Sequence, residues 1–252
     1  MWNGYYTAAS GMLSTIRMLD IVSNNLANIT TPSYKKDKVR VETVNFRNPS
    51  AKGENFDDIL NRQAKVGGVS IDFEPGSLKT TSRKLDLAIL NPNGFFAIRT
   101  PNGIRYTRDG EFFLNSKGVL VNKNGFEVMS KSNKPIMIPP NKGEANLAFS
   151  ENGDIYVDQV LLDTIKIVDF NDKSKLVKEG NSVFYMSDPN QKEIVISDPQ
   201  IRSGALERSN VSIADAMVDM VKITRMYEFQ QRVMDTILTD IARKTTDEVG
   251  RP

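Results

Sequence analysis

Carboxylate and amide side chains are the groups of this chain that could carry chemistry, because its 252 residues include neither cysteine nor histidine. Their absence excludes disulfides, thiolate nucleophiles, the usual zinc ligand sets and a Ser-His-Asp triad. The adjacent acids Asp57 and Asp58 are the kind of pair that general acid–base catalysis uses. They stand in a polar stretch rich in chain-breaking residues, where carboxylates are solvated, so we expect no catalytic role for them.

Metal and nucleotide sites have equally little support in the sequence. The oxygen-bearing residues Asp169, Asn171 and Asp172 lie close together, but the stretch DFNDKSKLVKEG lacks the glycine and the closing glutamate of a calcium loop. The glycines fall between predicted strands, and no GxxxxGK run is present. The sequence therefore predicts a protein that is not an enzyme, with no catalytic residue, no metal site, no cofactor and no small-molecule substrate.

The charge balance argues against nucleic acid as a partner. The chain has 33 basic and 31 acidic residues, and the resulting formal charge of +2 is too small to require a polyanion. The densest basic cluster lacks the aromatic-rich surface around it that a nucleic-acid site would have. This cluster consists of Lys35, Lys36, Lys38 and Arg40.

The sequence also lacks the residue patterns that are typical of a membrane-spanning segment and of a cleavable signal peptide. The sequence has no uninterrupted apolar span of about 18 residues, so we expect a chain that does not span a membrane. Its start, MWNGYYTAASGML, has no basic residue before the apolar positions and does not resemble a cleavable signal peptide. If the protein is exported, we expect a route other than the general signal-peptide pathway.

The asparagines Asn24, Asn25 and Asn28 follow an apolar pattern that steps by three and four, which predicts an amphipathic helix over about residues 3–28. Its seam consists of Tyr5, Ala8, Met12, Thr15, Leu19, Val22 and Leu26. Pro32 biases Thr31 away from the helical region, and Asn28 tolerates the left-handed geometry of a helix terminus. From these residues alone, the asparagines are either a helix terminus or a binding site.

The carboxyl-terminal stretch predicts a second, longer helix that carries two apolar rows. Ser212, with Asp215 three residues later, resembles a capping box at its start. One row is Ile213, Met217, Met220, Thr224, Tyr227, Gln231, Met234, Leu238 and Ile241. The neighbouring row is Ala216, Met220, Ile223, Tyr227, Gln230, Met234, Ile237 and Ile241. Together the rows are wider than a two-stranded seam, so we expect this helix to have partners on more than one side.

Between the helices the sequence predicts strands separated by turns. It reads FFAIRT, PNG, IRYTR, DG, EFFLNSKG, VLVNKNG, FEVMS from Phe95, and later strands are expected near 154–160 and 162–170. Turn dipeptides of the kind that short hairpins need occur at Asn93-Gly94, Asn102-Gly103, Asp109-Gly110, Asn124-Gly125 and Asn152-Gly153.

The fold class is therefore α+β, with long amphipathic N- and C-terminal helices, a coiled-coil layer, flanking a mainly antiparallel β domain. We predict an N-terminal helix within 1–33, an extended connector over 34–75, a β-rich body over 76–203 and a C-terminal helix within 204–252. The two helices would form one split helical assembly domain. They could pair within one chain, but the wide face of the second leaves apolar surface over, which favours packing between molecules and, if the contact does not close, a helical filament.

Four ordered motifs cover nearly the whole chain and are similar to those of a known family. They are YTAASGML with LDIVSNNLANITTPSYKK, then LDLAIL-NPNGFFAI, then YTRDGEFFLNSKGVLVNKNG, and finally GALERSNVSIADAMVDMVKITRMYEFQQRVM. They resemble the bacterial flagellar axial proteins of rod and hook, most closely the basal-body rod proteins. Two positions depart from the family pattern, Ser33 in place of glycine and Thr224 in place of glutamine.

The resemblance implies a structural subunit whose terminal helices stack into a hollow driveshaft that transmits torque. It implies assembly residues in the first helix and its motif, namely Tyr5, Met12, Leu19, Asn24, Asn25, Leu26, Asn28 and Tyr34. In the second helix and its motif it implies Ser209, Asn210, Met217, Met220, Arg225, Tyr227, Glu228, Met234 and Leu238. The β-domain turn motif is Thr107, Arg108, Asp109 and Gly110.

The implied partners are copies of the chain itself, other flagellar rod and hook subunits, and the type III export apparatus. The implied location is the periplasm-spanning rod of the basal body. Within the family, the length and the ending KTTDEVGRP are most similar to the proximal-rod proteins called F, and next to the distal-rod proteins called G. A distal-rod or hook-type subunit, or a secreted scaffold or adhesin outside the flagellum, remains the alternative.

Overall fold

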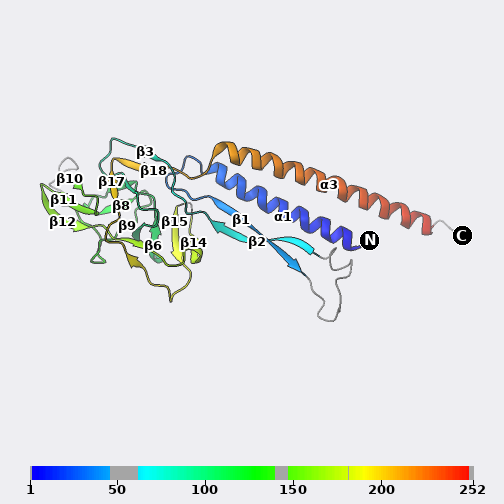
Figure 1. Cartoon of the computed structure of the whole chain (residues 1–252), viewed down its shortest axis with the longest axis horizontal. Coiled ribbons are helices and arrows are strands. Elements are labelled where there is room, and N and C mark those ends of the chain that lie inside the picture. The colour runs from blue at the N-terminus through cyan, green and yellow to red at the C-terminus, as the bar shows by residue number, and fades with distance from the viewer. Residues whose placement is uncertain (1, 46–61, 140–146, 181, 250–252) are drawn as a thin grey trace. The chain divides into compact units, whose positions relative to one another are not determined.

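The chain folds into two units, each assembled from segments that are distant in the sequence (Figure 1). The computed structural model describes residues 2–45, 62–139, 147–180 and 182–249. One unit, here called the helical unit, comprises 1–27, 37–71 and 212–252. The other, the β unit, comprises 28–36 and 72–211.

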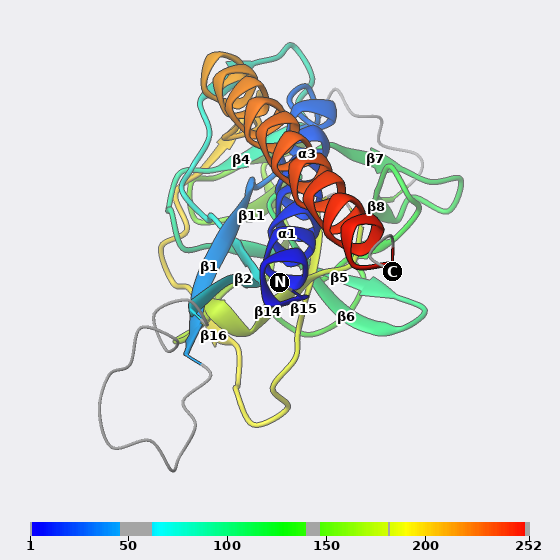
Figure 2. The ribbon, with the colours of Figure 1, turned by 90° about the vertical axis from the view of Figure 1, so that its right-hand side faces the viewer.

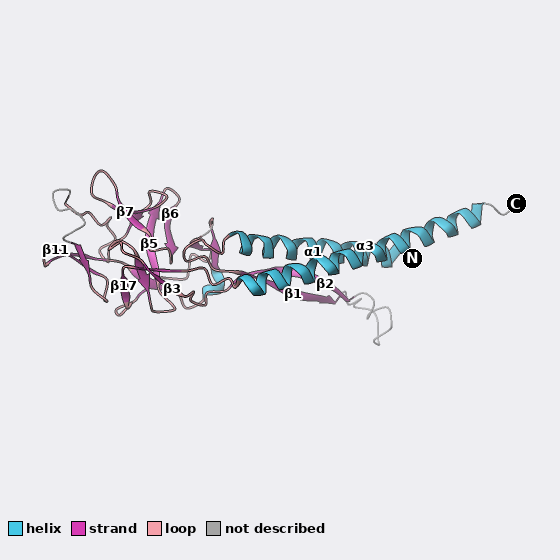
Figure 3. Cartoon of the chain, turned by 90° about the horizontal axis from the view of Figure 1, so that it is seen from above, coloured by secondary structure: helices cyan, strands magenta, loops and turns pink. Residues whose placement is uncertain are grey.

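The helical unit is built on two long helices, α1 (Trp2–Ala27) and α3 (Ile213–Val249). They lie side by side and run antiparallel, because the amino end of α1 and the carboxyl end of α3 point the same way (Figures 1 and 3). The start of α3 has the predicted cap, in which the Asp215 backbone N–H donates to Ser212 Oγ at 3.4 Å. The structure confirms two terminal helices that flank a mainly antiparallel β fold.

One of the two apolar rows of α3 is the more covered. The covered residues are Ala216, Met220, Ile223, Tyr227, Gln230, Met234 and Ile237. The residues that belong only to the first apolar row are exposed wherever their side chains are described. Met217, for example, keeps 56% of its surface in contact with solvent. Apolar side chains beyond both rows are exposed as well, including Phe229 at 61%. Within this chain, α3 therefore buries only part of its apolar surface.

A polar contact lies in the middle of the helix pair. Thr15 is buried, and its hydroxyl donates to Gln230 Oε1 at 2.9 Å. A Cβ atom added at Gly11, one turn earlier, would lie 3.2 Å from the Gln230 amide nitrogen, so the missing side chain at this position lets the two helices approach. Thr15 and Gln230 thus form a polar contact within a helix interface that is otherwise mainly apolar.

A long antiparallel hairpin completes the helical unit. Its strands, β1 (Asp37–Asn45) and β2 (Arg62–Ile71), pair from Asp37↔Ile71 to Asn45↔Arg62, with a register shift at Arg40/Val41. Figure 2 places β1 beside α1. Both strands fall in the stretch predicted as an extended connector, where the alternation of Val39, Val41 and Thr43 with charged residues indicates a strand. The polar stretch 47–58 lies outside the described residues, whereas 37–45 and 62–71 of the predicted connector are paired backbone.

The β unit consists of short strands in four separate sheets. The strands are β3 (Leu78–Thr80), β4 (Leu87–Ile89), β5 (Phe95–Thr100), β6 (Gly103–Thr107), β7 (Phe112–Leu114), β8 (Leu120–Asn122), β9 (Glu127–Val128), β10 (Leu147–Phe149), β11 (Asp154–Val157), β12 (Val160–Thr164), β13 (Ile167–Asp169), β14 (Leu176–Lys178), β15 (Val183–Met186), β16 (Ile194–Val195), β17 (Ile201–Ser203) and β18 (Ala205–Glu207). A 3₁₀ turn, η2 (Lys173–Lys175), precedes β14.

All strand pairs in these described sheets are antiparallel. The largest sheet has the order β14-β15-β6-β5-β9-β8-β7, with β13 pairing to β5 and β16. The others are β10-β11-β12, β17-β4 and β18-β3. One apolar core lies between these sheets, and the rings of Phe96 and Phe112 meet edge to face within it at 5.1 Å.

Two of the predicted hairpin turns are wrong. Asp109-Gly110 joins β6 to β7, which do not pair with each other, and Gly110 has no positive φ. A Cβ atom at Gly110 would lie 1.7 Å from the Leu87 carbonyl oxygen, so glycine is needed there for close backbone approach. Gly94 likewise has no positive φ, and its added Cβ atom would lie 2.9 Å from Ile89.

The strands expected near 154–160 and 162–170 are three instead of two. The chain turns at Asp158 and Gln159, which adopt φ values of 50° and 69°, and β11 pairs with β12 across this turn. A two-residue turn with both residues in the left-handed region normally contains glycine. This turn contains none, so the hairpin could not be recognised from the sequence.

The buried contact of Thr15 gives a test of the helix pair. Thr15→Val removes the donor and leaves the Gln230 amide oxygen without it, so we expect the free energy of unfolding to fall by about 1–2 kcal/mol. The double variant Thr15→Val/Gln230→Leu should recover most of this loss. Thr236→Val, whose exposed hydroxyl bonds only to Arg232 O in its own helix, is the matched control. Urea unfolding followed by helical circular dichroism measures the series, and a Thr15→Val value equal to the control would contradict the contact.

Candidate functional site

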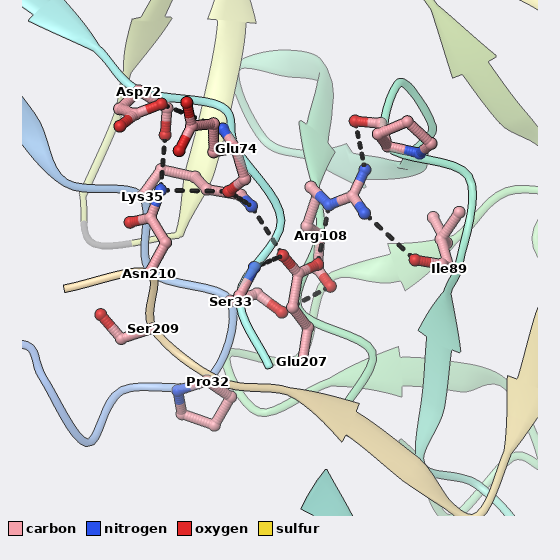
Figure 4. Close-up of polar contacts among 12 residues, drawn as sticks. Pro32, Ser33, Lys35, Asp72, Glu74, Ile89, Arg108, Glu207, Ser209 and Asn210 are labelled. Atoms are coloured by element: carbon pink, nitrogen blue, oxygen red, sulfur yellow. Dashed lines mark hydrogen bonds and ion pairs between the residues drawn. The ribbon is translucent and has the colours of Figure 1, made fainter. Parts of the chain in front are cut away.

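Three of the sequence motifs meet at one place in the β unit. The segments 33–36, 107–110 and 207–210 come from the first, third and fourth motif and lie together around a group of charged side chains (Figure 4). Segment 72–76 adjoins them. Three of these segments, 33–36, 72–76 and 207–210, are close to the positions at which the chain enters or leaves the β unit.

The centre of this site is the Glu207 carboxylate. Its Oε1 atom lies 2.6 Å from Lys35 Nζ, and its Oε2 atom lies 2.8 Å from Arg108 Nε. The Gly76 backbone N–H donates to the same Oε1 atom at 2.8 Å. The side chains of Lys35, Arg108 and Glu207 are each at most 2% exposed, and we call these three residues the ion cluster. Because they are buried, their charges must be balanced within the protein.

Arg108 uses its remaining guanidinium donors on backbone carbonyls. Nη1 donates to Gly94 O at 2.7 Å, and Nη2 donates to Ile89 O at 3.1 Å. Additional contacts join Nη1 to Asn91 O and Pro92 O at 3.2 and 3.1 Å. The planar fork thereby holds the loop after β4 while it binds Glu207. Lysine could not reproduce this geometry.

Burial and the neighbouring charges shift the pKa values of Glu207 and Lys35. Burial alone would raise the pKa of Glu207, but the positive charges of Arg108 and Lys35 outweigh burial and lower that pKa. Burial lowers the pKa of Lys35, and the attraction of Glu207 only partly offsets this. Because its pKa is lowered in the folded state, Glu207 contributes stability above its unfolded value near 4.5, and this contribution is lost as the pH falls through the folded value.

Asn210 and Lys35 bind segment 72–76 to this site. Asn210 Oδ1 accepts from the Lys36 backbone N–H at 2.7 Å, and its Nδ2 donates to Asp72 O and Glu74 O at 2.9 and 3.0 Å. Lys35 Nζ also donates to Glu74 O, at 2.7 Å. A single amide therefore ties together the three segments at the ends of the β unit.

Ser33 holds the turn before Lys35 in a left-handed conformation, with φ of 54°. Its side chain is fully buried and donates to Arg108 O at 2.7 Å. Its backbone N–H donates to Glu207 O at 2.9 Å. The φ value explains why glycine suits this position, and the hydroxyl bond offsets part of the strain that a side chain brings.

The other residues of the turn motif are buried around the cluster. Thr107 Oγ1 donates to Ser182 O at 2.6 Å, and Asp109 forms an ion pair with Lys123 at 3.0 Å. Tyr34 is 1% exposed, and Lys178 Nζ lies 4.2 Å above its ring. Ser209 is half-buried and accepts from the Val211 N–H at 3.3 Å. The expected sites at 34, 107–110 and 209–210 are thus one connected region.

The asparagine cluster does not act as one group. In the helical unit, Asn25 is buried and pairs with the backbone of Asp37 through two bonds of 2.9 Å, one from Nδ2 to Asp37 O and one from the Asp37 N–H to Oδ1. Asn24 is exposed. In the β unit, Asn28 is buried, and its Oδ1 accepts from Thr31 Oγ1 at 3.2 Å. Asn25 therefore fixes where β1 starts after the helix, while Asn28 belongs to the turn that follows it.

The remaining predicted assembly residues lie along the two helices. Half-buried positions are Met12, Leu19, Leu26, Met220, Tyr227 and Met234. Exposed positions are Met217, Arg225, Glu228 and Leu238. The side chain of Tyr5 lies outside the described residues, as do Asp57 and Asp58. The part of the helix residues, Tyr5 included, in assembly stays a prediction.

Sequence reasoning missed the two residues that matter most here, Lys35 and Glu207. Both stand inside the quoted motifs, and Glu207 follows Ala205 and Leu206 in a short apolar strand, where an acid needs a buried partner. The rejected calcium loop is a turn in which Asp172 accepts from the Ser174 N–H at 2.9 Å. Chemically, the site binds chain segments to one another through buried ion pairs and hydrogen bonds.

Substitutions in the ion cluster test its energetics. Glu207→Gln keeps the shape but leaves two buried cations without a counter-charge, so we expect unfolding to become easier by about 3–5 kcal/mol. Lys35→Met should cost less, because Arg108 still neutralises Glu207. Glu179→Gln, which removes an ion pair with Arg105 at the surface, should change little. Urea unfolding at neutral pH measures all three, and a Glu207→Gln protein as stable as Glu179→Gln would refute this description of the cluster.

The Asn25 pair with the Asp37 backbone gives a second test. Asn25→Ala leaves the Asp37 N–H and C=O without their partner, and we expect a loss of about 1–3 kcal/mol in the free energy of unfolding. Ser23→Ala, two positions earlier and exposed, should leave stability unchanged within about 0.5 kcal/mol. Thermal unfolding measures the stability of both variants. Equal stabilities would show that Asn25 is not an anchor for β1.

Models of three protein families match this chain over the regions just described. The model described as "Flagella basal body rod protein" matches residues 6–35, and "Flagellar hook protein FlgE/F/G D1 domain" matches 89–157. "Flagellar basal body rod FlgEFG protein C-terminal" matches 202–237. The matched stretches contain all three members of the ion cluster, Lys35, Arg108 and Glu207.

Whole proteins are similar along their full length. The flagellar basal-body rod protein FlgF of Caulobacter vibrioides is 30% identical over 251 residues, which cover 100% of this chain and 99% of that protein. The flagellar basal-body rod protein FlgG of Borreliella burgdorferi is 30% identical over 256 residues, covering 94% and 95%. The flagellar hook-basal body complex protein FlhO of Bacillus subtilis is 25% identical over 275 residues, covering all of both chains. The chain therefore belongs to the flagellar basal-body rod protein family, whose members are structural proteins and not enzymes.

Proposed function

We propose that this chain stacks helically through its terminal helices and so forms part of a hollow rod that transmits torque. The observation that carries the proposal is the surface of α3, which keeps large apolar side chains exposed although α1 packs against it. They are Ile213, Met217, Val218, Val221, Met226, Phe229, Val233 and Leu238. A helix with apolar residues beyond one stripe needs further apolar neighbours, and other subunits would supply them.

The size of this surface is sufficient to contribute substantially to association. Fully burying one side chain such as Met or Phe is worth ~1.5–3 kcal/mol. The eight side chains are about half exposed, so covering the rest would contribute on the order of 6–12 kcal/mol, comparable with the ~4–15 kcal/mol lost when subunits associate. The ridges of long antiparallel helices also suit knobs-into-holes packing in a layered bundle. A contact of this kind that repeats without closing produces a filament.

The ion cluster and Asn25 have a complementary role in this proposal. They fix the segments at the ends of the β unit and the start of β1, so that each subunit presents the same fold to its neighbours. Rigid positioning of this kind is what a shaft under torque requires. Their function would be structural within the subunit, and the apolar surface of α3 would make the contacts between subunits.

The proposed partners are further copies of this chain and other rod and hook subunits, and the proposed location is the rod that crosses the periplasm. Family membership supports both, and it also supports delivery by the flagellar type III export apparatus. Among the described helices, none is long and apolar enough to cross a membrane.

We also propose that the chain is a proximal-rod subunit of the F type. The alignment with FlgF of Caulobacter vibrioides spans the full chain in 251 positions and therefore needs almost no gaps. The alignment with FlgG of Borreliella burgdorferi takes 256 positions to cover 94% of a 252-residue chain and so contains insertions. The G type is the alternative, because its sequence identity is the same.

Polar substitutions on the exposed face of α3 test the stacking. Met217→Gln/Phe229→Gln should leave the free energy of unfolding of the monomer within about 0.5 kcal/mol per site, because both side chains are exposed. Self-association, measured by sedimentation velocity over a concentration series, should weaken by at least about tenfold because the apolar area buried between subunits is lost. Lys222→Gln on the same helix is the control. Unchanged association in the double variant would refute the proposal.

A further inference from the structure

The exposed edge of β12 is the first of two unusual strand edges in the β unit. Val160, Leu161 and Leu162 follow one another and are 68%, 55% and 38% exposed. In the sheet of order β10-β11-β12, β12 is the last of the described strands. At the last residue of β12, the Lys131 N–H donates to Thr164 O, so the open part of the edge is 160–163. An open apolar edge is a template for pairing with another chain.

The surroundings of this edge are acidic. Residues 147–164 contain Glu151, Asp154, Asp158 and Asp163 and include neither lysine nor arginine. Protective devices on open edges are usually lysines or prolines, and 160–163 has neither of them. We call this strand, which contains Asp163, together with Asp158 in the turn before it, the acidic edge.

The second edge is β3, which has the opposite charge. All three of its residues, Leu78, Lys79 and Thr80, are exposed, and it pairs only with β18 among the described strands. The exposed Arg208 lies next to it, because its backbone N–H donates to Ser77 O at 2.8 Å. Residues 77–84 contain Lys79, Arg83 and Lys84 and no acid. We call β3 with Arg208 the basic edge.

The two edges belong to different sheets and lie on different sides of the β unit, as Figure 1 shows for β12 and β3. We propose that the acidic edge of one copy of this chain pairs antiparallel with the basic edge of the next copy. The pairing would extend the β10-β11-β12 sheet by β3 and β18 of the neighbouring copy. Aliphatic side chains would meet Leu78 across the pair, and the carboxylates would face Lys79 and Arg208.

Charge selects this pairing over the symmetric one. Two acidic edges laid antiparallel would bring the carboxylates of both copies, at 158 and 163, into the same short interface. Like charges across a strand pair are destabilising, whereas opposite charges contribute to the pairing. A contact between two different surfaces of identical chains is heterologous and repeats from copy to copy, as a rod requires.

This inference rests on the proposed function, since the basic edge has only three strand residues. So few pairs would not hold two free molecules together, and the contact would form when stacking of the terminal helices brings neighbouring β units close at high effective concentration. The pairing would then fix the rotation of one β unit against the β unit of the next copy.

Cysteine cross-linking tests the contact, because the chain has no cysteine of its own. Two full-length variants, Val160→Cys and Thr80→Cys, are assembled together and oxidised. We expect disulfides mainly between the two different variants, and few between identical ones. Asn190→Cys, an exposed position away from both edges, replaces either partner as the control. Cross-linking equal to this control, or dominated by Val160→Cys with itself, would overturn the pairing.

Charge exchange gives the second readout. Asp163→Lys should reduce the cross-linking rate roughly fivefold, and adding Lys79→Asp to the same chain should restore it. Asp198→Lys, an exposed acid elsewhere, should have no effect. Particles that sediment normally but lack the cross-link would refute this inference and leave the proposed function intact. Absence of sedimenting particles at every concentration would refute the stacking and the edge pairing together.

Discussion

The fold depends on one buried carboxylate that must stay between two cations. Glu207 is almost completely covered and can be ionised there only because Lys35 and Arg108 contact its two oxygens. Each of these residues comes from a different part of the chain, so the cluster forms only when all three segments are in place. A buried ion pair adds little net stability compared with an apolar core, but an incomplete one is strongly unfavourable. The cluster therefore selects one arrangement of the ends of the β unit.

In the helical unit, the important quantity is how much of the apolar surface of α3 is covered by its own chain. One row of α3 is covered by its own chain, while the apolar residues outside that row face solvent. Thr15 and Gln230 fix the register of the pair, and Asn25 fixes the point at which β1 leaves α1. These contacts make the helix pair specific without using up its apolar surface. The rest of that surface is available to neighbours, which is consistent with membership of a family of rod subunits.

The sequence was sufficient for features that follow from periodicity. The helices at both ends, the cap at Ser212 and the antiparallel character of the middle region could all be predicted, because each depends on local residue pattern. The pairing of β1 with β2 and the turn at Asp158-Gln159 were missed, since the partner strands are separated by a polar stretch or joined without glycine. The ion cluster was missed for a physical reason. Local pattern cannot tell that Lys35, Arg108 and Glu207, far apart in sequence, meet in the core.

The central claim is that the terminal helices complete their packing between subunits. Hydrogen exchange of the full chain, followed by mass spectrometry in dilute solution and again in the sedimenting assembly, measures this most directly. We predict that amides of residues 213–238 gain strong protection on assembly, while amides in β5 and β8 of the core are equally protected in both states. Full protection of 213–238 already in the dilute monomer would contradict the account, because α3 would then need no neighbours.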